Sequence, residues 1–236
     1  ELVQADAIAR YRRLLGEEVR LQTGADENAY KNVLSAREAG VDTASFVSGN
    51  SENFRRLCTA LNVEIDDFLR TTERRHERAV QVLWQQLRAG DLYRREYSGL
   101  YCTGCEDFYL ERDLVDGVCP DHGARPLAVE EENYFFRLSS YQAQLEELLR
   151  SRQINIVPEV RRNEVLRFVE SGLRDISVSR SARRLQGWGI VVPGDDDQRI
   201  YVWIDALINY LSGPGFGAGE NWRRWWDDDV HKIHVI

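Results

Sequence analysis

Apolar side chains recur every three or four residues in several stretches of the chain, which is the spacing of one helix face. In residues 2–15 this stripe ends just before Gly16, a typical residue at a helix C-terminus. The same spacing predicts further helices over residues 31–40, 45–62, 73–90, 141–151, 161–172 and 206–213. In the helix over 45–62, the expected buried face consists of Phe46, Phe54, Leu57, Cys58 and Leu61.

Two segments have the character of β-strands. Val19 and Leu21 alternate with polar residues and run into the turn sequence TGADEN, which predicts a short strand that ends at a loop. The segment RIYVWID, residues 199–205, is expected to be a buried strand followed by a helix. Strands that alternate with helices indicate an α/β fold, in which ligands bind at the carboxyl ends of the strands.

Several polar residues near the expected helix boundaries have structural interpretations. Thr72 is expected to cap the helix over 73–90, and His76 is expected to order its first turn. Asp66 and Asp67 are adjacent carboxylates, and we expect them to act as caps and not as an acid and base pair.

Residues 97–134 differ from the flanking sequence because short aromatic pieces alternate with Gly and Pro. This segment contains the spacing Cys102-x2-Cys105-x13-Cys119-x2-His122. Two pairs of ligands on tight turns are typical of a zinc knuckle, and four protein ligands leave no open position for water, so the metal is expected to be structural. The alternative is four unrelated core or polar residues.

Two glycines flank the expected metal ligands. Gly104 and Gly123 are expected at turn positions that need a positive φ.

The composition is that of a globular protein. Of the 236 residues, 30% are charged and 43% are hydrophobic, and no apolar run approaches the ~20 residues that span a bilayer, so no membrane partner is expected. The formal net charge of -8 disfavours a broad nucleic-acid clamp, which needs clustered Lys and Arg. Clustered cysteines favour a reducing compartment, the cytoplasm. Because the chain begins with Glu1 and contains no methionine, we expect it to be an excerpt from a longer protein.

Short motifs along the chain resemble one family. In order they are IARYRRLLG, TGADEN, DDFLRTTERRH, GLYCTGCEDFY, ENYFFRLSSY, RNEVLRF, ISVSR, WGI and YVWIDALINYL. Together they resemble methionyl-tRNA synthetases, over nearly the whole chain. The resemblance implies an α/β, Rossmann-type class I synthetase catalytic fold split by a zinc-knuckle connective insertion. The first part of the catalytic domain would be residues 1–96, the insertion 97–172 with its knuckle at 97–134, and the truncated second part 173–236.

The activity implied by this resemblance is that of a methionine–tRNA ligase. L-methionine would be activated by ATP, which is normally accompanied by magnesium, to methionyl adenylate, and the methionyl group would then be transferred to tRNA(Met). The methionine carboxylate attacks the α-phosphate in line, so catalysis rests on positioning and on stabilising the charge of pyrophosphate.

The resemblance also assigns a role to the aspartate of TGADEN. Asp26 corresponds to the family residue that pairs with the ammonium group of methionine, for which a carboxylate that only accepts hydrogen bonds is suited. The alternative is an ordinary turn aspartate. Many members continue with His-Gly, whereas this chain has Asn28 and Ala29, so a contribution of that histidine is missing.

The amino-acid pocket is implied by the segment YVWIDALINY. Its residues would be Trp203 at the end of the strand and, on one face of the following helix, Ala206, Leu207 and Tyr210. The Tyr210 hydroxyl would lie near the thioether, and Trp203 would close over the substrate. Without the family, an aromatic stripe at this spacing is more typical of a core.

Two further residues match family positions. Arg180 of ISVSR would be the catalytic arginine that approaches the substrate carboxylate and the phosphates, where its planar fork binds bidentately. The alternative for Arg180 is a solvated salt bridge. His234 matches the beginning of a family stretch near the chain's end.

The chain contains no segment like the HIGH and KMSKS signatures of this enzyme class, which we take as truncation. We therefore expect the chain alone not to form methionyl adenylate at a useful rate. Alternatives are a non-catalytic paralogue that acts as a binding module and a class I synthetase for leucine, isoleucine or valine, although the latter usually carries a larger insertion than 97–172. A zinc-stabilised interaction protein unrelated to synthetases is the third alternative.

Overall fold

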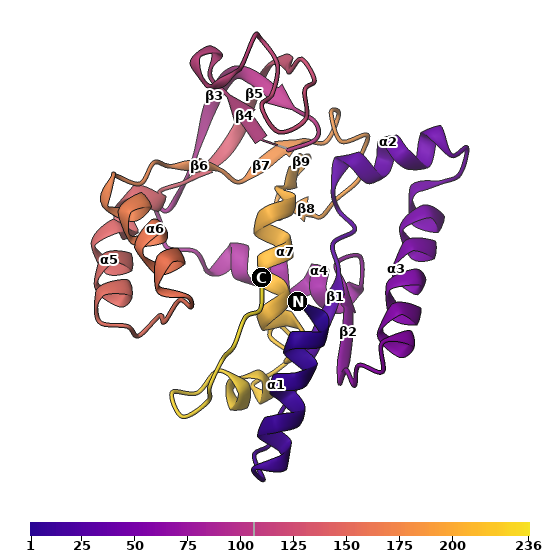
Figure 1. Cartoon of the computed structure of the whole chain (residues 1–236). Helices are drawn as coiled ribbons and strands as arrows, with labels where there is room; N and C mark the ends of the chain where they lie inside the picture. Colours follow the sequence, from indigo (N-terminus) through magenta and orange to yellow (C-terminus); the bar gives the residue numbers. More distant parts are fainter. Residues whose placement is uncertain (106) are drawn as a thin grey trace.

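Helix α7 (Val202–Ser212) lies in the middle of the computed structural model, which describes residues 1–105 and 107–236 (Figure 1). Glu106, part of the expected zinc segment, lies outside the described residues. Helix α4 (Arg74–Gln86) packs against α7. The core between them is formed by apolar side chains of α4, α7, the nearby strands and the segments next to them: Ala79, Val80, Ile190, Val192, Ile200, Ile208 and Phe216.

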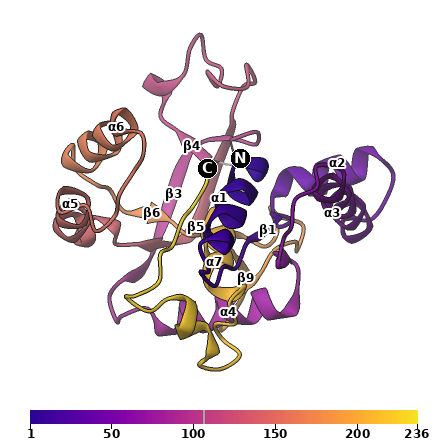
Figure 2. The same ribbon diagram turned by 60° about the horizontal axis from the view of Figure 1, so that its bottom comes forward.

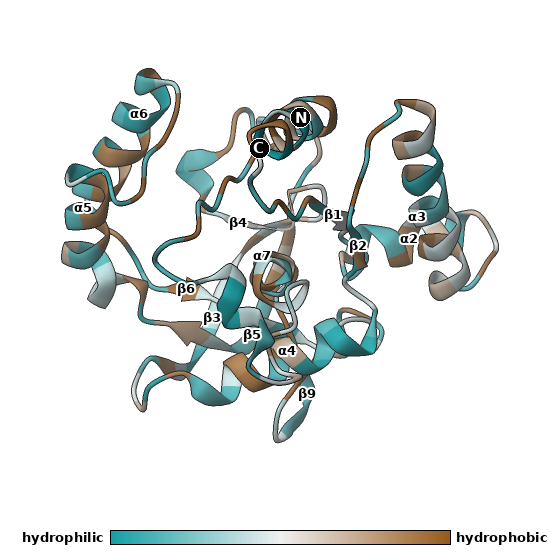
Figure 3. Ribbon diagram, turned by 90° about the horizontal axis from the view of Figure 1, so that it is seen from below, coloured by the Kyte–Doolittle hydropathy of each residue, from teal (hydrophilic) through white to brown (hydrophobic). Residues whose placement is uncertain are grey.

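Two helical pairs flank α7. The pair α2 (Tyr30–Glu38) and α3 (Thr43–Ala60) lies on one side, and the pair α5 (Gln142–Arg150) and α6 (Glu159–Glu170) lies on the other (Figures 1 and 2). The view from below shows the same order, with α7 between the pairs (Figure 3). Helix α1 (Leu2–Leu14) begins the chain. These helices confirm the helices that the apolar spacing of the sequence predicts.

Strands β1 (Gln22–Ala25) and β2 (Asp67–Arg70) form a parallel pair. Parallel neighbours need a crossover, which α2 and α3 provide. Gly24 lies opposite Leu69, which is fully buried. Among the described residues, parallel pairing occurs only between these two strands.

The remaining strands form two antiparallel sheets. The first has the order β4-β3-β5-β6, with bounds β3 (Leu92–Cys102), β4 (Asp107–Tyr109), β5 (Leu127–Phe136) and β6 (Ile176–Ser177). The second has the order β7-β9-β8, with bounds β7 (Ser179–Ser181), β8 (Val191–Val192) and β9 (Asp195–Ile200). Short 3₁₀ helices occur at Glu111–Asp113, Leu138–Tyr141 and Asn221–Trp225. The architecture is therefore mixed α/β.

The strand expected over residues 199–205 is wrong in its bounds. Strand β9 ends at Ile200, and α7 begins at Val202. The buried residues of α7 recur every three or four positions: Val202, Asp205, Ile208 and Ser212. This is helical spacing, so the apolar segment is buried along one helix face and not on both faces of a strand.

The expected buried face of α3 is also wrong. Phe54, Leu57 and Leu61 are exposed, and the buried residues are Val47, Ser51 and Cys58. Ser51 is buried because its hydroxyl bonds to the carboxylate of Glu27. Only Cys58 of the expected face is confirmed as a core residue. The hydrogen bond to buried Glu27 therefore accompanies an inward-facing Ser51, and the largest apolar side chains of α3 face outward.

The residues expected to cap helices, Thr72, Asp66 and Asp67, have other partners. Thr72 does not cap α4, whose N-cap is Glu73, because the Thr72 hydroxyl bonds to Glu27. Asp66 and Asp67 lie at the start of β2 and bind arginines. In the described part of the chain, no helix has the length and apolar character to cross a membrane.

We predict that Gly24→Ala destabilises the fold. A Cβ at this position would lie 2.1 Å from the Leu69 carbonyl oxygen, which is backbone and cannot move without disturbing the β1 and β2 pair. We expect the free energy of unfolding in urea to fall by about 1–3 kcal/mol. The matched control is Gly49→Ala in α3, where a Cβ meets nothing within 4 Å and should stabilise the helix by roughly 1 kcal/mol. Equal stability of the two variants would contradict the steric argument.

Candidate functional site

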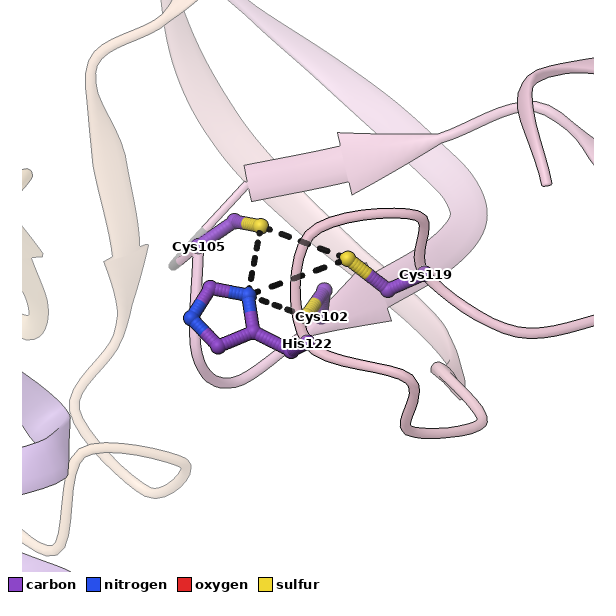
Figure 4. Close-up of side chains that lie close together, drawn as sticks. All are labelled: Cys102, Cys105, Cys119 and His122. Carbon is purple, nitrogen blue, oxygen red and sulfur yellow. Dashed lines mark hydrogen bonds between the residues drawn. The ribbon is translucent and has the colours of Figure 1, made fainter. Parts of the chain in front are cut away.

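Cys102, Cys105, Cys119 and His122 converge at one end of the molecule. Their ligand atoms all lie within 4.8 Å of one another, and the three sulfurs and His122 Nδ1 point toward a common centre (Figure 4). Cys105 Sγ lies 3.2 Å from His122 Nδ1 and 3.5 Å from Cys119 Sγ. The cysteines are free thiols. The sequence prediction of a four-ligand cluster is therefore confirmed.

The geometry of this cluster fits a tetrahedral metal ion. Zn–S bonds of about 2.3 Å in a tetrahedron place ligand atoms roughly 3.8 Å apart. The contacts of His122 Nδ1 to Cys102 Sγ and to Cys119 Sγ are 3.9 Å and 3.8 Å. Three thiolates and one imidazole form a donor set typical of structural zinc, since they fill all four positions.

The reason for glycine at position 104 differs from the prediction. Gly104 does not have a positive φ; instead, a Cβ there would lie 2.4 Å from His122 Cδ2. Gly123 does have a positive φ, of 62°, as expected. The first turn therefore needs glycine for space beside the imidazole, and the second needs it for backbone conformation.

The thiols of the cluster differ in their ionisation. Burial raises the pKa of Cys105 to about 12. Burial also opposes ionisation of Cys119, but hydrogen bonds from the His122 side chain and from backbone N–H groups outweigh it and lower the pKa to about 6. A metal ion must displace the proton of the Cys105 thiol when it binds. Metal affinity should therefore rise with pH.

The cluster is connected to the rest of the molecule by a partly buried arginine, Arg184. Tyr101, the neighbour of Cys102, is buried under the guanidinium of Arg184, which lies 4.1 Å from the ring centroid. Arg184 Nη1 also lies 3.2 Å from Glu131 Oε1 on β5. Arg184 follows β7, so this contact holds the metal-binding sheet against the segment that leads to α7.

A second group of predicted site residues lies around the first turns of α7. Asp26 follows β1 directly and is exposed. Strand β1 runs beside α7, because Gln22 Nε2 donates to the carbonyl oxygen of Asn209 and to its Oδ1, both at 2.9 Å. Two residues after Asp26, Asn28 Nδ2 donates to Asp205 Oδ2 at 3.0 Å. The end of β1 therefore lies next to the beginning of α7.

The predicted pocket residues share one face of α7, although the strand end proposed for Trp203 is wrong. Ala206 and Leu207 follow Trp203 by three and four residues, Tyr210 follows Leu207 by three, and all four lie outside the buried face of the helix. Trp203 is 56% exposed and Leu207 is 57% exposed. This apolar stripe is therefore not part of the core described here.

The predicted catalytic arginine is buried and not a solvated salt bridge. Arg180 is 2% exposed, and its guanidinium lies 3.8 Å from the ring centroid of Tyr201, the residue before α7. Arg180 Nη1 donates to the carbonyl oxygen and hydroxyl of Ser177 and to the carbonyl oxygen of Ser179. These contacts place it beside the beginning of α7.

Sequence reasoning did not identify Glu27, which is 1% exposed. Its carboxylate accepts hydrogen bonds from Ser51, Thr72 and, at 2.7 Å, Arg70 Nε. Its carbonyl oxygen accepts a hydrogen bond from Trp188 Nε1 at 2.9 Å. The loop that carries Asp26 is therefore held by α3, β2 and the segment before β8.

The sequence predicts that His76 orders the first turn of its helix. The structure shows that His76 also contacts α7. It is fully buried between α4 and α7, with Nδ1 2.8 Å from Ser212 Oγ and Nε2 3.8 Å from Asp205 Oδ1. Burial lowers the pKa of His76 to about 4, so the ring is neutral at neutral pH. A signal for Asp205 was available in the sequence, because it is the one acidic residue in the apolar run YVWIDALINY.

His234 lies against the predicted pocket. Its ring is perpendicular to that of Tyr210, with 4.3 Å between the centroids. The end of the chain therefore returns to α7.

Comparison with known proteins places the chain in a class. The model of the family described as "tRNA synthetases class I (M)" matches residues 1–126 and 113–236, which together are the whole chain. The chain belongs to this family of class I tRNA synthetases. The alternative of a zinc protein unrelated to synthetases is therefore wrong.

The individual relatives narrow this class. Over 98% of this chain, the sequence is 44% identical to the methionine–tRNA ligase of Caldanaerobacter subterraneus subsp. tengcongensis. Over 99% of this chain, it is 43% identical to the methionine–tRNA ligase of Mycobacterium bovis. It covers 36% and 46% of these two proteins, respectively. The chain therefore spans less than half the length of these relatives.

Solved structures agree in fold. The Mycobacterium tuberculosis methionyl-tRNA synthetase bound by methionyl-adenylate has a TM-score of 0.89 and 42% identity, over 97% of this chain and 46% of that one. The apo form of a Mycobacterium tuberculosis methionyl-tRNA synthetase has a TM-score of 0.70 and 35% identity, over 89% of this chain and 48% of that one.

We predict that removing the metal unfolds residues 97–130, because so small a sheet has little core of its own. Complete chelation should make this segment sensitive to protease while the helices around α7 stay resistant, as followed by limited proteolysis with mass spectrometry. Unchanged protection of 97–130 after verified metal loss would contradict the prediction.

Gly104→Ala should weaken metal binding, because its Cβ would collide with the His122 ring. We expect zinc affinity, measured by competition with a chromogenic chelator, to fall by about tenfold or more, the scale on which disturbed ligand orientation acts. Gly49→Ala, far from the cluster in an open position of α3, is the control and should bind zinc like the unaltered protein. Equal affinities would show that His122 adjusts freely.

Proposed function

We propose that the protein to which this chain belongs is a methionine–tRNA ligase and that the chain forms part of its catalytic region. The observation that carries this proposal is the match of the family model to the whole chain, together with about 40% identity to several methionine–tRNA ligases. The likeness to a structure bound by methionyl-adenylate supports the same activity.

The reaction has two steps. A carboxylate oxygen of L-methionine attacks the α-phosphorus of ATP, which normally arrives with magnesium, and the bond to the β,γ-phosphates breaks to release pyrophosphate. A ribose hydroxyl at the 3′ end of tRNA(Met) then attacks the carbonyl carbon of the adenylate, and AMP leaves. Neither step needs a covalent bond to the protein, so the side chains act by positioning and by stabilising charge.

The roles of the site residues follow the family pattern. Asp26 binds the methionine ammonium group, and the apolar stripe of α7 outside its buried face, namely Trp203, Ala206, Leu207 and Tyr210, lines the side-chain pocket. Support for this assignment comes from the hydrogen bonds that join the end of β1 to α7. Arg180 acts near the substrate carboxylate and the phosphates; its support is its place beside Tyr201 at the beginning of α7.

The metal in the cluster is zinc, and it is structural. Cys102, Cys105, Cys119 and His122 hold it, and when bound it stabilises the small sheet around β3 and β5. We assign the Rossmann-type catalytic fold to residues 1–96 and 173–236, with 97–172 as the connective insertion. The parallel pair β1 and β2 supports the first of these parts. The clustered free thiols favour the cytoplasm.

The proposal is tested by ATP–pyrophosphate exchange with the full-length protein that contains this chain, loaded with zinc. We expect exchange that depends on methionine and not on leucine, isoleucine, valine or cysteine. Asp26→Ala should lower kcat/KM for methionine by about tenfold to a hundredfold, the effect of losing a hydrogen bond to a charged group. Asp228→Asn, at an exposed position, is the control.

Exchange with none of these amino acids, from a folded and zinc-loaded protein, would favour the non-catalytic paralogue. Exchange that depends on another apolar amino acid would favour a synthetase of different specificity.

A further inference from the structure

Four buried polar side chains lie in a row between the end of β1, α4 and α7. They are Asn28, Asp205, His76 and Ser212, and the most exposed of them, Asn28, is 6% exposed. Asn28 Nδ2 donates to Asp205 Oδ2 at 3.0 Å, Asp205 Oδ1 faces His76 Nε2 at 3.8 Å, and His76 Nδ1 contacts Ser212 Oγ at 2.8 Å. Polar groups at this depth are costly to bury unless they are paired. The two hydrogen bonds at the ends of the row pair Asn28 with Asp205 and His76 with Ser212, whereas the contact between Asp205 and His76 is longer than a hydrogen bond.

The position of the Asn28 to Asp205 bond relates it to the proposed methionine site. Asn28 lies two residues after Asp26, and Asp205 lies between Trp203 and Leu207 on α7. Because Asp205 is on the buried face and Trp203 and Leu207 are exposed, the bond lies behind the pocket and not in it. It joins the element that carries the ammonium partner to the element that carries the pocket.

Both ends of this bond are tied to backbone groups by further hydrogen bonds. Asn28 Nδ2 also contacts the carbonyl oxygen of Thr71 at 3.2 Å, and the backbone N–H of Glu27 donates to the Thr71 hydroxyl at 2.9 Å. At the other end, Asp205 lies on the first turns of α7. Its backbone N–H donates to the carbonyl oxygen of Tyr201 at 3.1 Å. The bond therefore joins two backbone elements, the loop after β1 and the first turns of α7.

We infer that Asn28 and Asp205 are positioning residues for methionine, which set the distance between the Asp26 carboxylate and the side-chain pocket on α7. This inference rests on the proposed function. Neither residue touches the substrate; each acts through the element that it holds. An interaction of this kind orients the bound amino acid, so its loss should affect methionine binding more than ATP binding.

The test is a double-mutant cycle in the full-length, zinc-loaded protein, with KM for methionine and KM for ATP measured separately by pyrophosphate exchange. Asn28→Ala and Asp205→Ala should each raise KM for methionine by roughly tenfold and leave KM for ATP within about twofold. The double variant should again show roughly tenfold, not the hundredfold expected of independent sites. Asp205→Asn keeps an oxygen that accepts from Asn28, so it should stay within about threefold of the unaltered protein.

Asp175→Asn is the matched control, because Asp175 accepts hydrogen bonds from Tyr93 and from Ser139, which lie outside the row of Asn28, Asp205, His76 and Ser212. A residue that only stabilises the fold would lower the fraction of active protein, and so kcat, without changing KM for methionine. If Asp205→Ala does not fold by circular dichroism, Asn28→Ala and Asp205→Asn carry the comparison.

Three results are decisive. A selective rise in KM for methionine with non-additive coupling supports the inference. Unchanged KM values, or equal changes for methionine and ATP, with an unaltered protein that is active on methionine, overturn the inference and leave the proposed function intact. No methionine-dependent exchange by the unaltered protein overturns both.

Discussion

The candidate methionine site depends on the burial of two acidic side chains, Glu27 and Asp205, beside the end of β1. A buried carboxyl group is tolerated only where hydrogen bonds replace its lost hydration. Glu27 takes these bonds from Ser51, Thr72 and Arg70, and Asp205 takes one from Asn28. Because the donors come from α3, β2 and the loop after β1, satisfying the two acids also holds these elements around one point.

The two faces of helix α7 differ in character. Its buried face combines apolar contacts to α4 with Asp205 and Ser212, which meet His76. On another face Trp203 and Leu207 are 56% and 57% exposed, and neighbouring exposed apolar side chains can mark a binding surface. The polar contacts of Asp205 and Ser212 on the buried face hold α7 in one rotation about its axis. They therefore determine where the apolar residues outside that face point.

The metal-binding sheet is organised by a different principle. Its ligands lie within a short segment, and a bound ion would supply stability that the few core residues of this sheet cannot. Its connection to the rest of the chain is a tertiary contact, in which Arg184 stacks on Tyr101 and pairs with Glu131. A bound ion would therefore order the sheet locally, while Arg184 connects the sheet to the segment that leads to α7.

The sequence by itself determined the helices, the four metal ligands and the family resemblance, because each of these depends on spacing within short segments. Only the tertiary structure decided that residues 202–205 are helical, that α3 buries Ser51 and not Phe54, and that Gly104 makes space for His122. Asn28 and Asp205 are 177 residues apart in the chain. Local periodicity carries no information on such pairs, since which face of an element is buried depends on the partners that the folded chain brings to it.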